Sequence, residues 1–561
     1  MTPRQILATT IAGAALLLLP PPTISQTAKP PAARAGAASS EQVALEQAAA
    51  LMDQGRFPEA EEQVRRVLKQ TPGSANGHNL LGIIHDQMGR AAEAESEYRA
   101  ALRLAPGLVS ARNNLGNLLA RLGRSQEAQR EFERVLKADP QHARAHYNLA
   151  TLLVNQQKFS DAARHFAAAL KLSRQLDPVV ALAYISAALR AQQTPEALQA
   201  AEGLARTFPR EERVLFNLAM TLAEGGQYEP AARLFSEVSR LRPATPEVLY
   251  NLGVAYYNLK QFDEASSALA ESADLDPKPA EPHFRLALIS SERGDRDNSL
   301  LEFKHVVERA PDRAQYHYLL GREYFQAGYW EGAAASYQRA TELDGREPLY
   351  FLSLGNAQFH ATNYPLAVAA FQQASALDPS LSEINFLIGY NLRAQGKFDE
   401  ARTSFERQLA STPGHREALA NLGYIAVEQG QFPEAEGYLK KVLAEDPDHV
   451  AATFDLARAR AKQRDYPGAI QLFERAIQLS PDLTQAYYQL FLMYSRNKQA
   501  EKGEKALAEF KRLEELDKQI RAAQMRLDKT RKLRLSGAKG EELAQPEGGG
   551  QPSAPPPPGR N

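Results

Sequence analysis

The chain has no cysteine among its 561 residues. That absence excludes disulfides, thiolate catalysis and cysteine metal sites, and it suits an oxidising compartment without establishing one. Neither sign of charge is in excess, because 66 lysine and arginine residues face 67 aspartate and glutamate residues, for a formal net charge of -1. No whole-chain electrostatic field therefore gathers nucleic acid or coats an anionic membrane. We expect no nucleic-acid partner.

Long apolar runs are scarce, and the one near the start of the chain is short. Arg4 precedes a largely apolar run from Ile6 to Leu19, three prolines follow, and small residues flank a cut after Ser25. This is the layout of a secretory signal peptide, and a run of that length is too short to span a bilayer comfortably. We expect residues 1–25 to be a cleaved signal peptide, with an uncleaved anchoring start as the alternative. The mature chain is then expected to be exported, periplasmic or extracellular, with no transmembrane segment.

Catalytic motifs are also lacking. No histidine pair carries a glutamate at zinc-protease spacing, and neither a glycine-rich phosphate loop nor a nucleophile elbow is present. His142 and His146 stand four residues apart, but no carboxylate or third ligand is in local register with them. His415 and His449 occupy the same repeat position as His142, which favours a structural habit over a metal site. We expect no enzyme, no cofactor and no metal.

What the chain does have is a period. Prolines stand 34 residues apart in three runs, with Gly345 in the place of one of them; the prolines are Pro72, Pro106 and Pro140, then Pro209, Pro243, Pro277 and Pro311, then Pro379, Pro413, Pro447 and Pro481. A fixed period in this range indicates a stack of identical supersecondary units, and such stacks usually bind other proteins.

One unit, residues 109–142, shows what repeats. Apolar residues recur at helical spacing over residues 115–119, Gly123 interrupts the pattern, and the spacing resumes over residues 128–136 until Pro140. Glycine suits the end of the first helix because it adopts a left-handed backbone without steric cost. Proline suits the end of the second because it lacks an amide donor and clashes with a continuing helix. The pattern predicts two helices with a glycine turn.

Columns of one residue type run through these units. A glycine column comprises Gly82, Gly116, Gly253, Gly321, Gly355, Gly389 and Gly423, with Ala150, Ala219, Ala287 and Ala457 in the same register. A large-residue column comprises Tyr98, Phe132, Phe166, Phe235, Phe303, Tyr337, Phe371, Phe405 and Phe473. Glycine costs stability inside a helix, so its recurrence predicts the close approach of a neighbouring helix.

Segments such as residues 251–257 (NLGVAYY), followed by residues 262–265 (FDEA) and 275–277 (LDP), resemble tetratricopeptide repeats. The resemblance covers residues 41–517, about 14 units. It implies an all-α, right-handed superhelical solenoid of stacked antiparallel helix pairs, whose first helices line a concave groove that grips a partner peptide or domain. The register slips around residues 173–176, and Gln192 replaces a turn glycine. A loop insertion and a bend between two sub-arrays both fit this irregularity.

The flanks of the array differ from it in composition. Residues 26–40 and the Pro/Gly-rich residues 536–561 are predicted to be disordered. A helical pattern continues through residues 518–535, where seven basic residues from Lys518 to Arg534 face one acid, Asp528. We interpret this segment as a basic extension of the C-terminal capping helix. Peripheral contact with a membrane surface or an acidic partner is the alternative.

The resemblance also implies which residues line the groove, because the family tends to turn certain positions of each unit toward its concave side. Applied here, those positions give a predicted partner-binding set of Asn217, Tyr250, Asn251, Tyr257, Phe284, Arg285, Tyr318, Arg322, Phe325, Asn356, Phe359, Phe386, Tyr390, Asn421 and Tyr424. Aromatic rings would supply apolar contact, and asparagine amides would bond an extended backbone. The alternative is that these residues pack between repeats.

The expected function follows from the fold and from the missing motifs. We expect an exported, non-enzymatic scaffold for protein–protein interaction that binds a peptide or protein segment in its central groove. The alternative is a periplasmic subunit of an envelope or polysaccharide-secretion assembly, because tetratricopeptide arrays occur in such systems.

Overall fold

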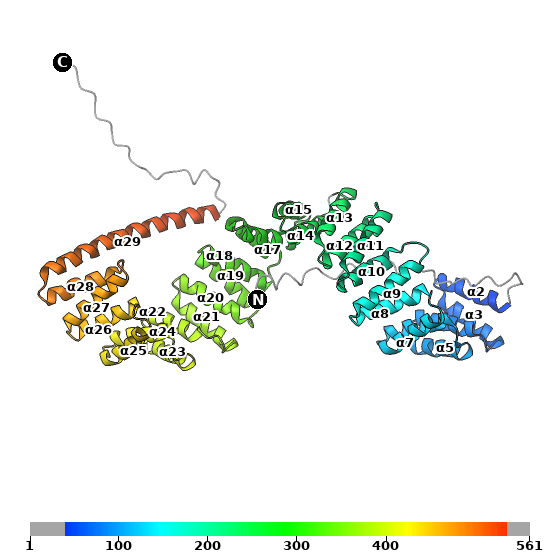
Figure 1. Cartoon of the computed structure of the whole chain (residues 1–561), viewed down its shortest axis with the longest axis horizontal. Coiled ribbons are helices and arrows are strands. Elements are labelled where there is room, and N and C mark those ends of the chain that lie inside the picture. The colour runs from blue at the N-terminus through cyan, green and yellow to red at the C-terminus, as the bar shows by residue number, and fades with distance from the viewer. Residues whose placement is uncertain (1–39, 244, 536–561) are drawn as a thin grey trace, which may run out of the picture. The chain divides into compact units, whose positions relative to one another are not determined.

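The structure is a computed structural model that describes residues 40–243 and 245–535. In these residues the chain forms 28 helices and no strand (Figure 1). No helix of this described part is both long enough and apolar enough to cross a membrane. The predicted signal peptide, all of the predicted linker except Ser40, and the predicted tail lie outside the described residues.

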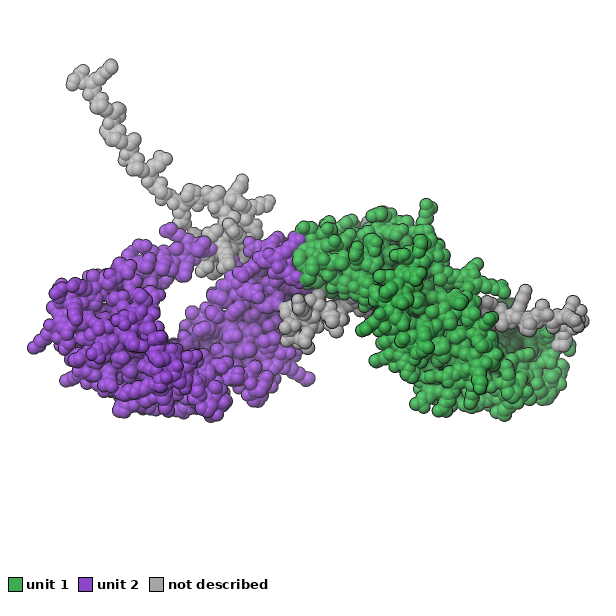
Figure 2. All heavy atoms as spheres, in the orientation of Figure 1, with its two compact units in different colours: residues 1–285 green, residues 286–561 purple. Residues whose placement is uncertain are grey.

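The chain divides into two compact units, residues 1–285 and residues 286–561 (Figure 2). The helices of the first unit are α2 (Ser40–Asp53), α3 (Phe57–Gln70), α4 (Ala75–Gln87), α5 (Ala91–Leu104), α6 (Val109–Arg121), α7 (Ser125–Ala138), α8 (Ala143–Asn155), α9 (Phe159–Leu172), α10 (Pro178–Arg190), α11 (Thr194–Thr207), α12 (Glu212–Glu224), α13 (Tyr228–Leu241), α14 (Pro246–Asn258) and α15 (Phe262–Leu275). The division falls inside α16 (Glu281–Glu292).

The second unit continues with the same kind of element. Its helices are α17 (Arg296–Arg309), α18 (Ala314–Gln326), α19 (Trp330–Leu343), α20 (Pro348–His360), α21 (Tyr364–Leu377), α22 (Ile384–Ala394), α23 (Phe398–Ser411), α24 (Arg416–Glu428), α25 (Phe432–Glu445), α26 (Val450–Lys462), α27 (Tyr466–Leu479), α28 (Thr484–Arg496) and α29 (Ala500–Leu535).

Consecutive helices pack as pairs, from α2 on α3 to α14 on α15 in the first unit and from α18 on α19 to α28 on α29 in the second, and each of these pairs packs on the next within its unit. The predicted all-α stack of antiparallel helix pairs is confirmed. In the unit inspected above, α6 and α7 are joined through Gly123, whose φ is 75°, and α7 ends just before Pro140. The turn glycine and the terminating proline therefore take the places that the sequence predicted.

The glycine column exists because the second helix of each pair presses a large side chain against the first. A Cβ atom added at Gly116 would lie 2.6 Å from the ring of Phe132, and one added at Gly355 would lie 2.5 Å from the ring of Phe371. Both rings are fully buried. In the α10–α11 pair the large and the small side chain change places. The large Ile185 of α10 stands in the glycine column, and the small Ala201 of α11 stands in the large-residue column.

The irregularity near Pro178 is a loop insertion. α9 ends at Leu172 and α10 begins at Pro178, while a single buried apolar cluster runs from Ala94 to Ala268 without a break at this loop. Gln192, at the missing turn glycine, still adopts a φ of 61°. The stack thus tolerates both departures without dividing there.

Thr362 occupies the same kind of turn with a φ of 60°, which strains a β-branched residue. Thr362→Gly should raise the free energy of unfolding by roughly 0.5–1 kcal/mol, because glycine adopts this backbone freely but also loses more entropy on folding. Urea denaturation followed by circular dichroism measures the change. The reverse substitution at a turn glycine, Gly396→Thr, should lower the urea midpoint; equal effects of the two substitutions would contradict this explanation.

Candidate functional site

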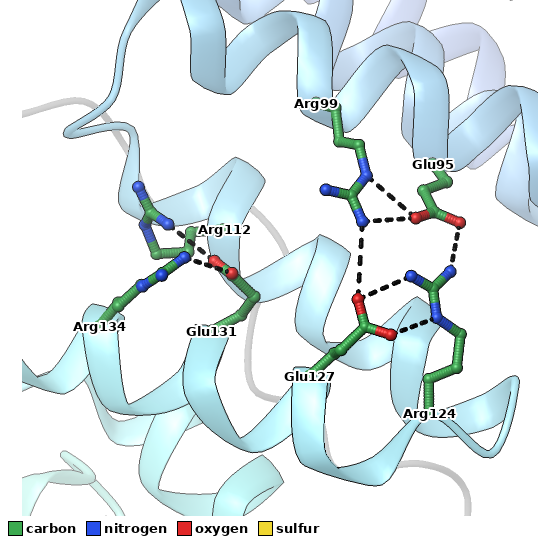
Figure 3. A network of polar contacts seen from close by, with 7 residues as sticks. All are labelled: Glu95, Arg99, Arg112, Arg124, Glu127, Glu131 and Arg134. Carbon is green, nitrogen blue, oxygen red and sulfur yellow. Dashed lines mark hydrogen bonds and ion pairs between the residues drawn. The ribbon is translucent and has the colours of Figure 1, made fainter.

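Several charged side chains on or next to the second helices α3, α5 and α7 of the first unit pair with one another. Arg124 contacts Glu95 at 2.8 Å and Glu127 at 2.7 Å, and Arg99 closes the network on the same two carboxylates (Figure 3). The hydrogen bonds from Arg124 lower the pKa of Glu127. Arg90 makes the same kind of contact with Glu61 one unit earlier. These networks join successive helix pairs, so their charges are already satisfied within the array.

Aromatic residues at the fifth position of a unit pack against the core of their own pair. Tyr318 lies 5.6 Å from buried Tyr337 between ring centroids, and Phe386 lies 5.9 Å from buried Phe405. The same contact recurs outside the predicted set, where Phe216 lies 5.7 Å from Phe235. Because the same contact recurs in several repeats, packing within the array explains Tyr318 and Phe386 better than a binding role does.

In the second unit, rings at the ninth and twelfth positions of successive repeats join with neighbouring rings and arginine side chains in a different arrangement, which we name the ring ladder. It comprises Phe325 of α18, Trp330 of α19, Phe359 and His360 of α20, Tyr390 and Arg393 of α22, Tyr424 of α24 and Arg458 of α26. His360 is exposed and the others are half-buried, in contrast to the fully buried large-residue column.

Each member of the ring ladder contacts the next. At its start, Trp330 stacks on His360 with centroids 4.5 Å apart, and Phe325 meets both rings edge-on. Phe359 meets His360 at 5.2 Å and Tyr390 at 5.6 Å between centroids. The ladder therefore extends without interruption from α18 to α22.

At its other end the ladder alternates rings with guanidinium groups. The Arg393 guanidinium lies 4.7 Å from the centroid of Tyr390 and 4.8 Å from that of Tyr424, while Arg458 lies 5.4 Å from Tyr424 on α24. A guanidinium over a ring face is attracted by the ring's quadrupole. This order of groups offers apolar faces and hydrogen-bond donors side by side.

The two arginines differ in how their charge is balanced. Arg458 pairs with Glu428 and, at 2.9 Å, with Asp455. Burial raises the pKa of Asp455 even though the hydrogen bond from Arg458 opposes that rise. Arg393 contributes to lowering that pKa from a longer distance, but it forms no ion pair in the described part of the chain. No acidic side chain among the described residues therefore engages its donors.

Three predicted residues are buried and do not belong to an accessible surface. Tyr257 is 3% exposed, Arg285 is 4% exposed and lies over the Tyr257 ring, and Asn421 is 8% exposed. Asn421 donates a hydrogen bond to the carbonyl of Glu417, four residues earlier in the same helix. The side chains of these three residues serve the packing of the array.

The other predicted residues outside the ladder are half-buried. Asn251 donates to the carbonyl of Glu247 in its own helix, and Arg322 pairs with the neighbouring Glu323 at 2.8 Å. The remaining ones are Asn217 on α12, Tyr250 on α14, Phe284 on α16 and Asn356 on α20. The structure thus brings four predicted residues, Phe325, Phe359, Tyr390 and Tyr424, into one continuous arrangement.

Three of the histidines cap the starts of helices. The Nδ1 atoms of His142, His415 and His449 accept hydrogen bonds from backbone amides three residues on, which satisfies free amides at helix starts. His146 contacts His165, 2.8 Å away between ring nitrogens, instead of sharing a ligand with His142. Among the described residues, no group of three or more histidine, aspartate and glutamate side chains is placed to hold a metal.

A separate cavity lies in the first unit between α11 and α13. It has a volume of about 480 Å³ and is lined by Leu198, Ala201, Leu222, Tyr228 and Leu234, with Glu202 and Arg233 among its polar residues. None of the predicted site residues lines it. Its size suits one or two partner side chains, whereas the ring ladder suits an extended segment.

Comparison with protein families gives matches along most of the array. A family described as "Tetratricopeptide repeat" matches residues 45–109, 113–178, 386–440 and 421–483, a second model of that description matches residues 222–287, and a "TPR repeat" model matches residues 321–360. Together these matches cover more than half of the chain. The chain belongs to the tetratricopeptide repeat family.

Solved structures resembling this tetratricopeptide repeat protein include the Cut9–Hcn1 hetero-tetramer of APC/C, at 16% identity over 85% of this chain and 94% of that chain, with a TM-score of 0.33. Yeast Tom70 gives 16% identity over 76% and 96%, with a TM-score of 0.29. YrrB, described as a TPR protein with an unusual peptide-binding site, gives 21% identity over 33% and 96%, with a TM-score of 0.29. No curated protein matches the chain.

The prediction missed four members of the ring ladder in this tetratricopeptide repeat protein. Arg393 is the twelfth residue of its unit and Arg458 the ninth of its own, so the columns that identified Phe325 and Tyr390 would have found them. His360 stands at the thirteenth position, which the family also tends to turn inward. Trp330, the one tryptophan of the sequence, is the first residue of α19, and it stands in a further aromatic column that the prediction did not use, with Phe262, Tyr364, Phe398, Phe432 and Tyr466 at the same position.

Proposed function

We propose that this tetratricopeptide repeat protein is a non-catalytic scaffold that binds a peptide or protein segment along the ring ladder of its second unit. Proteins of this family generally act as protein-interaction scaffolds. The observation that carries the choice of surface is the stacking of Arg393 between Tyr390 and Tyr424. Half-buried rings and an arginine without an ion pair are the residue types that dominate binding energy at protein interfaces.

The chemistry of the ladder suits an extended segment rich in apolar and acidic side chains. The ring faces would take apolar groups, and the free donors of Arg393 would take a carboxylate. We propose no cofactor, no metal and no nucleic-acid partner. Export to the periplasm or beyond the cell remains our proposal from the N-terminal sequence, which lies outside the described residues.

Photo-crosslinking in the native host tests this proposal. A benzophenone amino acid placed at Tyr424 or at Phe359 should capture the same partner, because both residues belong to the ladder. Tyr438, a half-buried tyrosine on the second helix of the Tyr424 pair, is the matched control and should give no such adduct. An equally strong adduct from Tyr438, or none from either ladder position, would exclude the ladder as the contact surface.

A further inference from the structure

The last helix is far longer than the helix on which it packs. α29 has 36 residues, whereas α28 has 13 (Figure 1). Ala506 and Leu513 of α29 are buried, and Thr484, the first residue of α28, reaches Asp517. Every residue from Glu515 to Leu527 is exposed. About half of the helix thus lies beyond its packing partner, although most helical stability in proteins comes from the packing of an amphipathic face.

The exposed part carries a narrow apolar stripe that continues from buried Leu513. Leu516, Ile520, Ala523 and Leu527 follow it at alternating spacings of three and four residues, which is the a/d spacing of a coiled coil. Leu516 is 44% exposed, Ile520 46% and Leu527 69%. A helix that lies on a membrane presents a broad apolar face, often with aromatic residues. This narrow seam without aromatic residues favours another helix as the occupant.

Charges in the phase of the seam indicate which helix that is. Glu509 stands seven residues before Leu516, and the sequence places Arg534 seven residues after Leu527. Parallel pairing of two α29 helices would set glutamate against glutamate and arginine against arginine. Antiparallel pairing, with Leu516 level with Leu527, sets Glu509 against Arg534 of the other helix. Opposite charges brought level in this way attract each other, whereas the like charges of the parallel arrangement repel.

The charge of the whole helix supports the same orientation. Residues 500–517 carry six acidic and four basic side chains, while residues 518–534 carry seven basic and one acidic. Antiparallel pairing lays the basic half of each helix along the acidic half of the other. We propose that α29 pairs antiparallel with α29 of a second copy of the chain, through Leu516, Ile520, Ala523 and Leu527.

Disulfide crosslinking tests the pairing cleanly because the chain has no cysteine of its own. Full-length Leu516→Cys and Leu527→Cys should form disulfide dimers when mixed and oxidised, but not when either is oxidised alone. In the antiparallel pair the two copies of residue 516 are 11 residues apart along the axis, about 16 Å. That separation is well beyond disulfide reach, which requires Cα atoms within about 7 Å.

A matched control stands at equal height on the opposite face. Lys518→Cys mixed with Met525→Cys also brings two residues level, but roughly half a turn away from the seam, so no dimer should form. Light scattering should in addition show that Ile520→Asp converts a wild-type dimer to a monomer with unchanged helicity. Self-crosslinking of the single variants, crosslinking of the control mixture, a monomeric wild type, or binding of a monomer to anionic lipid vesicles would each overturn the proposal.

Discussion

Gly355→Ile is expected to lower the free energy of unfolding by about 3 kcal/mol, because the added side chain would occupy the space of the Phe371 ring. Phe371→Ala is expected to cost about 3–5 kcal/mol, since it empties a fully buried ring position. The double variant should be more stable than either single variant. It reproduces the exchange of sizes that Ile185 and Ala201 make naturally in the first unit.

A double-mutant cycle measures this coupling through urea denaturation and the hydrogen-exchange protection of α20 and α21. Gly355→Ala serves as the control and should cost much less, because alanine already stands in the glycine column at four other units, Ala150, Ala219, Ala287 and Ala457. Additive losses in the double variant would show that the glycine column and the large-residue column are not complementary.

The fold was predictable from the sequence because a repeat enforces the same contact at every unit. A single glycine opposite a single ring would be a weak signal. Gly116 with Phe132 and Gly355 with Phe371 stand in the same register of their repeats, and in both pairs the ring leaves no room for a Cβ atom. Turn positions were predictable wherever glycine marked them. They were less so at Gln192, where stacking with neighbouring pairs holds a non-glycine residue at positive φ.

The candidate site was only partly predictable. The position of a residue within its repeat predicts the direction in which its side chain points, but not whether neighbouring side chains bury it. Tyr257 and Phe325 both stand at the twelfth position, yet Tyr257 is buried beneath Arg285 while Phe325 is half-buried beside Trp330. That difference depends on side chains of neighbouring helices, which vary from unit to unit. Trp330 enters the site as the first residue of α19, a position at which Phe262 and Phe398 also carry rings in their own units.

Tyr390→Ala combined with Tyr424→Ala is expected to weaken binding of the captured partner roughly 100-fold or more, because each aromatic anchor at an interface contributes at least about 1.4 kcal/mol, which is tenfold in affinity. Their loss also removes the two faces between which Arg393 is held. Titration calorimetry measures the loss. Tyr438→Ala is the matched control and should leave affinity near wild type. The half-buried rings of the ladder are not core, so circular dichroism should show unchanged helicity; a loss of helicity that parallels the loss of binding would show them to be packing residues.

The fluorescence of Trp330 tests most directly whether the partner binds on the ring ladder. This residue is the one tryptophan of the chain, and its ring stacks on His360 within the ladder. Titrating the captured segment, in a form without tryptophan, should change the emission and saturate at the calorimetric affinity. In the Tyr390→Ala, Tyr424→Ala variant the same change should require roughly 100-fold more segment. Tight binding that leaves the emission of Trp330 unchanged would contradict the assignment of the ring ladder as the binding surface.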